Sequence, residues 1–130
     1  MAFIPWHQRP GAPASGTFLC LADALGESEA RGFVFGEGKA RFDMFIVRKN
    51  NEVYGYLNEC PHALTPLETF TDRFFDVGKT HILCSTHGAL FLPHNGACVA
   101  GPCAGKNLIP IAIKASPDKD GRLSLVIGAP

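Results

Sequence analysis

Glycine and proline interrupt this chain so often that short strands are favoured over long regular elements. Its 130 residues include 14 glycines and ten prolines, and short apolar runs separated by turn residues follow one another from Thr17 onward. Such runs are typical of all-β sandwiches and small barrels. We expect one domain over residues 16–130, large enough for a core of its own, preceded by an N-terminal arm, residues 1–15, in which three prolines prevent a regular helix.

The apolar runs and turn signals predict individual elements. Asp23 is expected to cap a single helical turn after the first strand. The Asn-Gly pair in residues 93–96 predicts a hairpin, and residues 49–52 and 118–121 predict two further turns. Alternation over residues 109–113 places three isoleucines on one face of a strand. Strands are expected at residues 17–21, 32–35, 44–47, 53–57, 80–83, 89–92, 97–99, 109–113 and 122–127.

Charge and cysteine content disfavour several classes of protein. Twelve basic and twelve acidic residues give a net charge of zero, which argues against a nucleic-acid binder. The N-terminus lacks the basic and apolar regions of a signal peptide, and no apolar run approaches the ~20 residues that span a bilayer. We therefore expect a cytoplasmic protein without a membrane span. Five cysteines are an odd set, which disfavours a full disulfide framework and favours metal ligands.

Two short loops that pair cysteine with histidine carry the functional signal. Cys60-Pro61-His62 is followed 21 residues later by Cys84-Ser85-Thr86-His87. Each loop offers one thiolate and one imidazole, so together they match a site with one iron bound by sulfur and one by nitrogen. The same four side chains would also close a tetrahedral zinc site. We regard zinc as the weaker alternative, because structural zinc stabilises small modules that lack a core.

The two loops resemble the Rieske signature, C-x-H followed by C-x-x-H. Gly101-Pro102 resembles the proline loop that covers the cluster in that family, and the resemblance extends over about residues 17–127. It implies the all-β, Rieske-like antiparallel fold (the ISP-domain fold), with three sheets. In that fold a small cluster-binding subdomain, here about residues 60–101, is inserted into a base subdomain.

The resemblance also implies the ligands of one Rieske-type [2Fe–2S] cluster per chain. Cys60 and Cys84 would bind the inner iron, and His62 and His87 would bind the outer, solvent-facing iron.

Two departures separate this chain from the cytochrome bc-type Rieske proteins. Those proteins carry an extra cysteine in each ligand loop, joined by a disulfide, where this chain has Thr65 and Thr86. They also place a serine and a tyrosine after the second histidine, where this chain has Ala89-Leu90-Phe91. Because hydrogen bonds to the cluster sulfurs raise the potential, we expect one low in the Rieske range of about −150 to +300 mV.

Electron transfer needs no general acid, base or nucleophile, and we find no phosphate-binding loop, so no catalytic site is expected. The primary hypothesis is a soluble ferredoxin that carries one electron from a flavin-type reductase to a terminal oxygenase or similar acceptor. The first alternative is the small iron–sulfur subunit of a larger oxidoreductase, nitrite-reductase-like or arsenite-oxidase-like. The second alternative is a structural zinc-binding domain.

The remaining cysteine, histidine and phenylalanine side chains are expected to be structural. Cys98 and Cys103 bracket a Gly-Pro turn; we favour ordinary buried cysteines over extra ligands or a disulfide. Cys20 is expected as a small core residue, and His81 and His94 as structural histidines. Phe70, Phe74 and Phe75 are expected to fill the core between the ligand loops, with a docking patch for a partner as the weaker alternative.

Overall fold

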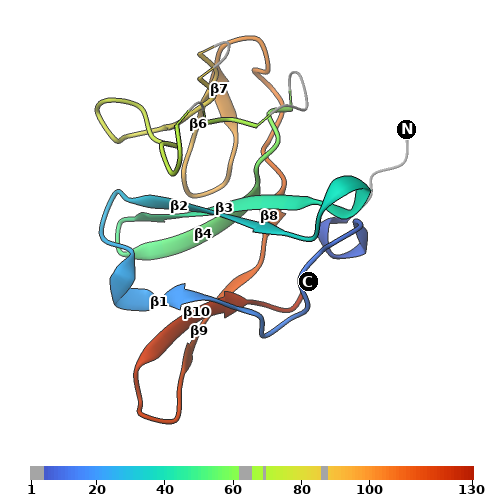
Figure 1. The fold of residues 1–130 in the computed structure, drawn as a ribbon. Coiled ribbons are helices and arrows are strands. Elements are labelled where there is room, and N and C mark those ends of the chain that lie inside the picture. The colour runs from blue at the N-terminus through green and yellow to red at the C-terminus, as the bar shows by residue number, and fades with distance from the viewer. Residues whose placement is uncertain (1–4, 62–65, 69, 86–87) are drawn as a thin grey trace.

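Three antiparallel sheets follow one another along the length of the molecule (Figure 1). The computed structural model describes residues 5–61, 66–68, 70–85 and 88–130. The lower sheet has the strand order β1-β10-β9, the central sheet β2-β3-β4-β8 and the upper sheet β5-β6-β7, which confirms the all-β prediction. The strands are β1 (Phe18–Leu21), β2 (Ala30–Phe35), β3 (Phe42–Lys49), β4 (Glu52–Leu57), β5 (Ile82–Leu83), β6 (Leu90–Phe91), β7 (Cys98–Ala100), β8 (Pro110–Ile111), β9 (Ile113–Pro117) and β10 (Leu123–Ile127).

Helical structure in the described ranges is limited to three short 3-10 turns, η1 (Trp6–Gln8), η2 (Ala22–Ala24) and η3 (Gly38–Ala40). The expected cap at Asp23 is wrong. Asp23 lies inside η2, whose N-cap is Leu21 without a side-chain hydrogen bond. None of the helices that the structure describes is long and apolar enough to cross a bilayer.

The central sheet separates two hydrophobic cores. Successive side chains of a strand point to opposite faces, and β3 buries both sets. Phe45 and Val47 pack into the upper core, whereas Met44 and Ile46 pack into the lower core. In the upper core Phe45 stacks on Phe74, with ring centroids 4.2 Å apart. The uninterrupted apolar run of β3 therefore reflects a strand that is covered on both faces.

The predicted turns are present. Asn50 and Asn51 both have positive φ between β3 and β4, as a two-residue hairpin turn requires. In the β6–β7 hairpin only Gly96 of the Asn-Gly pair has positive φ, and its N–H donates to the carbonyl of Leu92 at 2.8 Å. The N–H of Asp118 donates to the carbonyl of Arg122 at 2.8 Å and closes the β9–β10 hairpin.

The single strand expected over residues 109–113 is wrong, because the chain changes sheets there. β8 pairs with β4 in the central sheet, whereas β9 pairs with β10 in the lower sheet. The carbonyl of Ala112, between the two strands, accepts the N–H of Gly128 at 2.8 Å. The common face is confirmed, since Ile111 is buried and Ile109 and Ile113 pack against the same lower core.

Two contacts link distant segments to this framework. Trp6 of the arm is buried and meets Phe42 edge-on, with ring centroids 6.4 Å apart. The hydroxyl of Tyr56 on β4 donates to the carbonyl of Pro93 at 2.6 Å, which ties the central sheet to the β6–β7 hairpin. The upper sheet is thereby held in place above the central one.

Candidate metal centre

Cys60 and Cys84 lie just after strands and point into the same upper core. Cys60 follows the end of β4, and Cys84 follows β5 directly. Both side chains are 0% exposed and belong to one buried cluster. Of the four expected ligands these are the two that the structure places. His62 and His87, and likewise Thr65 and Thr86 in the same loops, lie outside the described residues.

Asn58 holds the first loop. Its side-chain oxygen accepts the N–H of Leu67 at 2.8 Å. Its amide nitrogen donates to Glu68 at 2.7 Å and to Asp43 at 3.2 Å. The carbonyl of Leu67 in turn accepts the N–H of Ser85 at 2.8 Å. One buried amide therefore joins the end of β4, the far side of the first loop and, through Leu67, the second loop.

Charged side chains connect the arm to the same region. The guanidinium of Arg9 lies 2.9 Å from the carboxylate of Glu59, the residue before Cys60. Both side chains are about one quarter exposed. Asn58, Arg9 and Glu59 had no motif that marked them for this role in the sequence.

Glycines shape the second loop and the segment beside it. Gly88 has φ +72°, and its N–H donates to the carbonyl of Cys84 at 2.9 Å. The N–H of Cys84 donates to the carbonyl of Ala89 at 2.9 Å. Gly101 has φ +95°, and a Cβ there would lie 2.7 Å from the Cα of Ala89. The Gly101-Pro102 segment therefore lies directly against the second loop, as only a residue without a side chain permits.

Cys98 and Cys103 are buried, as expected, but they also lie together. Their sulfur atoms are 3.0 Å apart. Burial, together with the neighbouring Cys98 and Cys60 thiols, raises the pKa of Cys103 to about 12. Three sulfurs therefore adjoin one another at the metal centre. The sequence showed three cysteines, and only the fold shows that they meet.

The remaining expected structural residues divide into core and surface. Phe74 is fully buried, Phe75 packs against the upper core, and Cys20 is buried in the lower core. The expectation for Phe70 is wrong, since its side chain is 69% exposed. It begins a tight turn in which the N–H of Arg73 donates to the carbonyl of Phe70 at 3.1 Å, and this turn directs the ring outward.

The two histidines outside the loops have different settings. The ring nitrogen Nδ1 of His81 lies 2.9 Å from the hydroxyl of Thr80 and 3.7 Å from the carboxylate of Asp76. His94 is exposed in the β6–β7 turn. Neither histidine belongs to a group of three or more candidate ligands within the described part of the chain.

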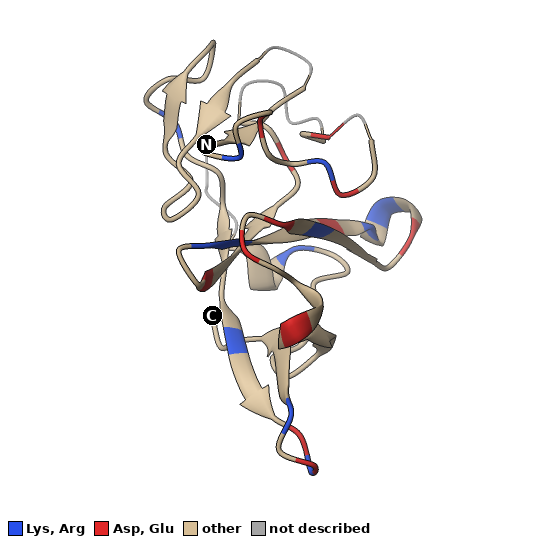
Figure 2. Cartoon of the chain, turned by 90° about the vertical axis from the view of Figure 1, so that its left-hand side faces the viewer, with Lys and Arg blue, Asp and Glu red and all other residues tan. Residues whose placement is uncertain are grey.

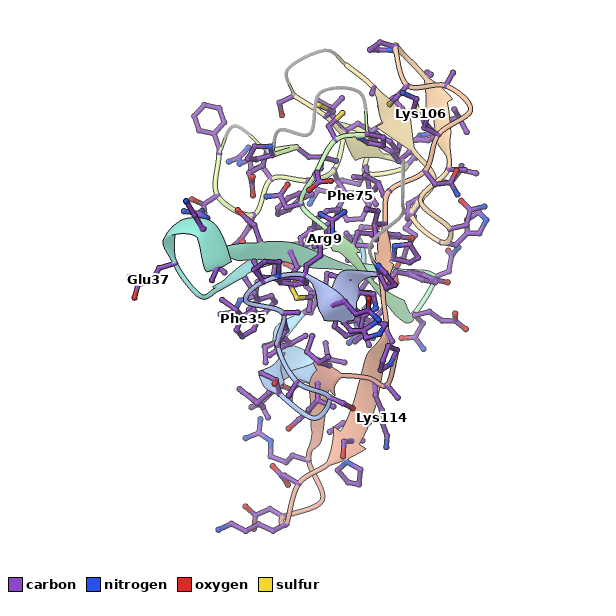
Figure 3. All side chains as sticks on the ribbon, turned by 90° about the vertical axis from the view of Figure 1, so that its right-hand side faces the viewer. Arg9, Phe35, Glu37, Phe75, Lys106 and Lys114 are labelled. Atoms are coloured by element: carbon purple, nitrogen blue, oxygen red, sulfur yellow. The ribbon has the colours of Figure 1, made fainter. Side chains whose placement is uncertain are left out.

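The region around the second loop lacks charge. Residues 80–105 contain no Asp, Glu, Lys or Arg. Figure 2 shows charged positions on the central and lower parts of the molecule and on loops of the upper part, whereas the strands of the upper sheet carry none. Lys106 lies at the border of this neutral region (Figure 3). Two buried thiols fit a metal group that takes soft thiolate ligands.

The fold and the paired loops define an all-β domain that presents two buried thiols for a metal centre. Residues 17–117 match the family model of the Rieske [2Fe-2S] domain. The chain therefore belongs to the Rieske [2Fe–2S] domain family, and its cofactor is a [2Fe–2S] cluster. This confirms the family and the cofactor expected from the Cys/His loops.

Solved structures with a similar fold include ferredoxins and complexes of a ferredoxin with an oxygenase. The ferredoxin of carbazole 1,9a-dioxygenase from Nocardioides aromaticivorans IC177 superimposes with a TM-score of 0.61 at 22% identity, covering 89% of this chain and 100% of that chain. The Sphingomonas yanoikuyae B1 ferredoxin superimposes with a TM-score of 0.58 at 21% identity, and the match covers 88% of this chain and 99% of that chain. A chain from the complex of reduced oxygenase and oxidised ferredoxin in carbazole 1,9a-dioxygenase gives 0.59 at 21% identity, covering 85% and 91%. A search of curated proteins found no match.

Proposed function

We propose that this chain is a Rieske ferredoxin that carries single electrons from a reductase to a terminal oxygenase or similar acceptor. The observation that carries the proposal is the extent of the structural match. The chain aligns with the whole length of a ferredoxin that serves an oxygenase, and a similar fold occurs in a ferredoxin–oxygenase complex. The proposal places the carrier in the cytoplasm, as the sequence led us to expect.

The proposed ligands are Cys60 and Cys84 for one iron and His62 and His87 for the other. When bound, the cluster takes up and releases one electron. The upper core excludes water from the two sulfur ligands, which are fully buried, and Asn58 fixes the two loops relative to each other. We assign the cluster-binding subdomain to about residues 60–101, inserted into a base subdomain.

The proposed reduction potential is low for the family. Ala89, Leu90 and Phe91 offer no side-chain hydroxyl to the cluster. Fewer hydrogen bonds to sulfur leave the reduced, more negative cluster less stabilised, which lowers the potential. A low potential suits a carrier between a flavin-type reductase and an oxygenase.

The ligand assignment is tested by metal analysis and electron paramagnetic resonance (EPR). The purified chain should contain two irons and two labile sulfides, and the reduced protein should give the spectrum of mixed nitrogen and sulfur ligation. Cys84→Ser and His87→Cys should each change or abolish that spectrum, whereas Cys20→Ser, at a buried cysteine of the lower core, should leave it unchanged. A colourless protein with one zinc per chain would overturn the assignment.

The carrier role is tested separately from the ligands. We expect reversible one-electron reduction in voltammetry and reoxidation of the reduced protein by a Rieske oxygenase. Tagged protein isolated from its native cell should run as a free small chain. Stoichiometric isolation with a large oxidoreductase subunit would instead support the complex-subunit alternative.

A further inference from the structure

Cys98 and Cys103 are not among the proposed cluster ligands, yet their sulfur atoms lie 3.0 Å apart. The two side chains are 7% and 0% exposed. A disulfide bond is about 2.05 Å long, so the sulfurs need to approach by only about 1 Å. We propose that Cys98 and Cys103 form a reversible dithiol–disulfide pair beside the metal centre.

The backbone orients the two cysteines toward each other. Cys98 begins β7, and Cys103 lies in the turn after it. Lys106 links them, since its carbonyl accepts the N–H of Cys98 at 2.9 Å and its N–H donates to the carbonyl of Cys103 at 2.9 Å. Gly101 and Gly105, both with positive φ, flank Cys103 and allow the tight path of the turn. The two cysteines are therefore held together within one hydrogen-bonded turn.

The reduced form is also accommodated. The sulfur of Cys98 lies 3.2 Å from the carbonyl of Ala100, a distance at which a thiol donates a hydrogen bond. In the disulfide form this donor is lost, but the carbonyl belongs to an edge of the sheet next to an exposed turn. Both states of the pair therefore fit the same fold.

A small-molecule disulfide supplies the oxidant. The thiol of Cys98, the more exposed of the two, loses its proton and attacks the small disulfide, so that a mixed disulfide forms and one thiolate leaves. The sulfur of Cys103 then displaces the second thiolate and forms the Cys98–Cys103 bond. The two protons of the cysteines end on the two released thiols, and the two electrons reduce the small disulfide. The reverse exchange restores the dithiol.

The pair would influence the cluster through Cys60, and this consequence rests on the proposed function. Cys103 shares a hydrogen bond with Cys60, the proposed ligand of the inner iron. A thiol at Cys103 can donate to that ligand sulfur, whereas a disulfide cannot. Because hydrogen bonds to ligand sulfurs raise the potential of a cluster, the potential should be higher with the dithiol than with the disulfide.

The pair is tested by differential alkylation of the full-length holoprotein. The protein is equilibrated without oxygen in mixtures of reduced and oxidised glutathione, denatured in iodoacetamide, then reduced and labelled with N-ethylmaleimide. Trypsin releases residues 80–106 as one peptide, which contains Cys84, Cys98 and Cys103. In oxidising mixtures Cys84 should carry the iodoacetamide label, whereas Cys98 and Cys103 should carry the N-ethylmaleimide label. In reducing mixtures all three should carry the iodoacetamide label.

Variants separate the pair from general thiol chemistry. In Cys103→Ser the mixed disulfide at Cys98 cannot be resolved, so peptide mass analysis before the reduction step should show at most a glutathione adduct at Cys98. Cys20→Ser should keep the N-ethylmaleimide label at both Cys98 and Cys103. In the unmodified protein, the proposal would be overturned by the iodoacetamide label at all three cysteines in every mixture, or by a mixed glutathione adduct at one cysteine as the end product. If Cys103→Ser fails to fold, the labelling of the unmodified protein decides.

The same samples keep this inference distinct from the proposed function. The EPR spectrum reports the cluster, and the labels report the cysteine pair. If Cys98 and Cys103 carry the expected labels but the Rieske EPR spectrum is absent, only the proposed function is rejected. If the Rieske spectrum is present but the two cysteines lack the expected labels, only the cysteine pair is rejected. Where both hold, the potential should depend on the glutathione ratio in the unmodified protein but not in Cys103→Ser.

Discussion

The side-chain oxygen of Asn58 accepts the backbone N–H of Leu67 at 2.8 Å, and this bond closes the first ligand loop onto the end of β4. Asn58 is buried and spans nine residues of sequence with this single contact. Because Leu67 also accepts the N–H of Ser85, the relative position of both loops depends on it.

Asn58→Leu should lower stability and loosen the cluster. The substitution leaves the buried N–H of Leu67 without its partner, which costs about 1–3 kcal/mol. Urea unfolding of the holoprotein measures the change in the free energy of unfolding. The rate of iron loss to a chelator measures how firmly the two loops hold the cluster. Asn107→Leu, at an exposed asparagine, is the control and should change stability by no more than about 0.5 kcal/mol. Equal midpoints for the two variants would contradict the role of Asn58.

Gly101→Ala should be more disruptive than Gly105→Ala. Both glycines have similar positive φ, +95° and +90°, so both substitutions carry a left-handed backbone cost of about 1–2 kcal/mol. Only at Gly101 does the new Cβ also meet Ala89, 2.7 Å from its Cα, whereas nothing lies within 4 Å at Gly105. Thermal unfolding of the two variants measures the difference. Equal destabilisation would show that the turn can move away from the second loop.

Asp76 should make stability depend on pH in the acid range. Burial acts to raise its pKa, but hydrogen bonds from the backbone N–H groups of His81 and Thr80 and from the Thr80 hydroxyl outweigh it, and the pKa is lowered overall. A carboxyl group whose pKa is lowered by folding stabilises the folded protein at pH values above its pKa in the unfolded chain. This stabilisation is lost as the pH falls through the pKa of the group in the folded protein.

Asp76→Asn tests this contribution through the pH dependence of unfolding. The variant should be less stable than the unmodified protein at neutral pH, and the difference should shrink as the pH falls into the acid range. A difference in the free energy of unfolding that stays constant from neutral to acid pH would contradict the carboxylate's role.

Electron delivery should depend weakly on salt if the upper sheet docks on the acceptor. Residues 80–105 carry no formally charged side chain apart from titratable histidine, so the upper sheet itself offers little charge for salt to screen. The rate of reduction of a Rieske oxygenase, followed by stopped flow, should change little while the Debye length falls from about 30 Å to 3 Å with rising ionic strength.

Val99→Lys provides the matched test of that salt dependence. Val99 lies on β7 and is 49% exposed, so a lysine there adds one charge to the neutral face without filling the core. The variant should gain a salt dependence that the unmodified protein lacks. A steep fall in rate with salt in the unmodified protein would place docking on a charged face instead.

The strands were predictable where local pattern and turn chemistry agreed. Asn50-Asn51 and Gly121 mark turns because they tolerate positive φ, and each turn lies where it was expected. The strand at residues 109–113 was misjudged because alternation reports which face is buried, not which partner strand is paired. Phe70 was misjudged for a related reason, since an apolar side chain in a tight turn has no neighbouring strand to cover it.

The sequence predicted which residue types form the candidate site, but it did not predict the contacts that hold them in place. Cys60, His62, Cys84 and His87 were recognised because thiolate and imidazole pairs at that spacing have few uses besides metal binding, and family membership confirms the cofactor. The four ligand assignments remain a proposal. Asn58 and the pair Cys98–Cys103 were not predictable in these roles, because their partners are brought to them by loop closure and carry no motif.

Local properties of the chain determined its class: glycine, proline and alternating apolar residues dictate short antiparallel strands, and two Cys/His loops dictate the metal chemistry. The tertiary structure decided how those loops are held. The contact of Gly101 with Ala89, the hydrogen bond of Asn58 to Leu67 and the approach of Cys98 to Cys103 arise when segments pack over a shared core. Local conformational preferences act within a few residues, whereas these contacts depend on how the three sheets are arranged. The residues that surround the Cys/His motif could therefore be identified only from the fold.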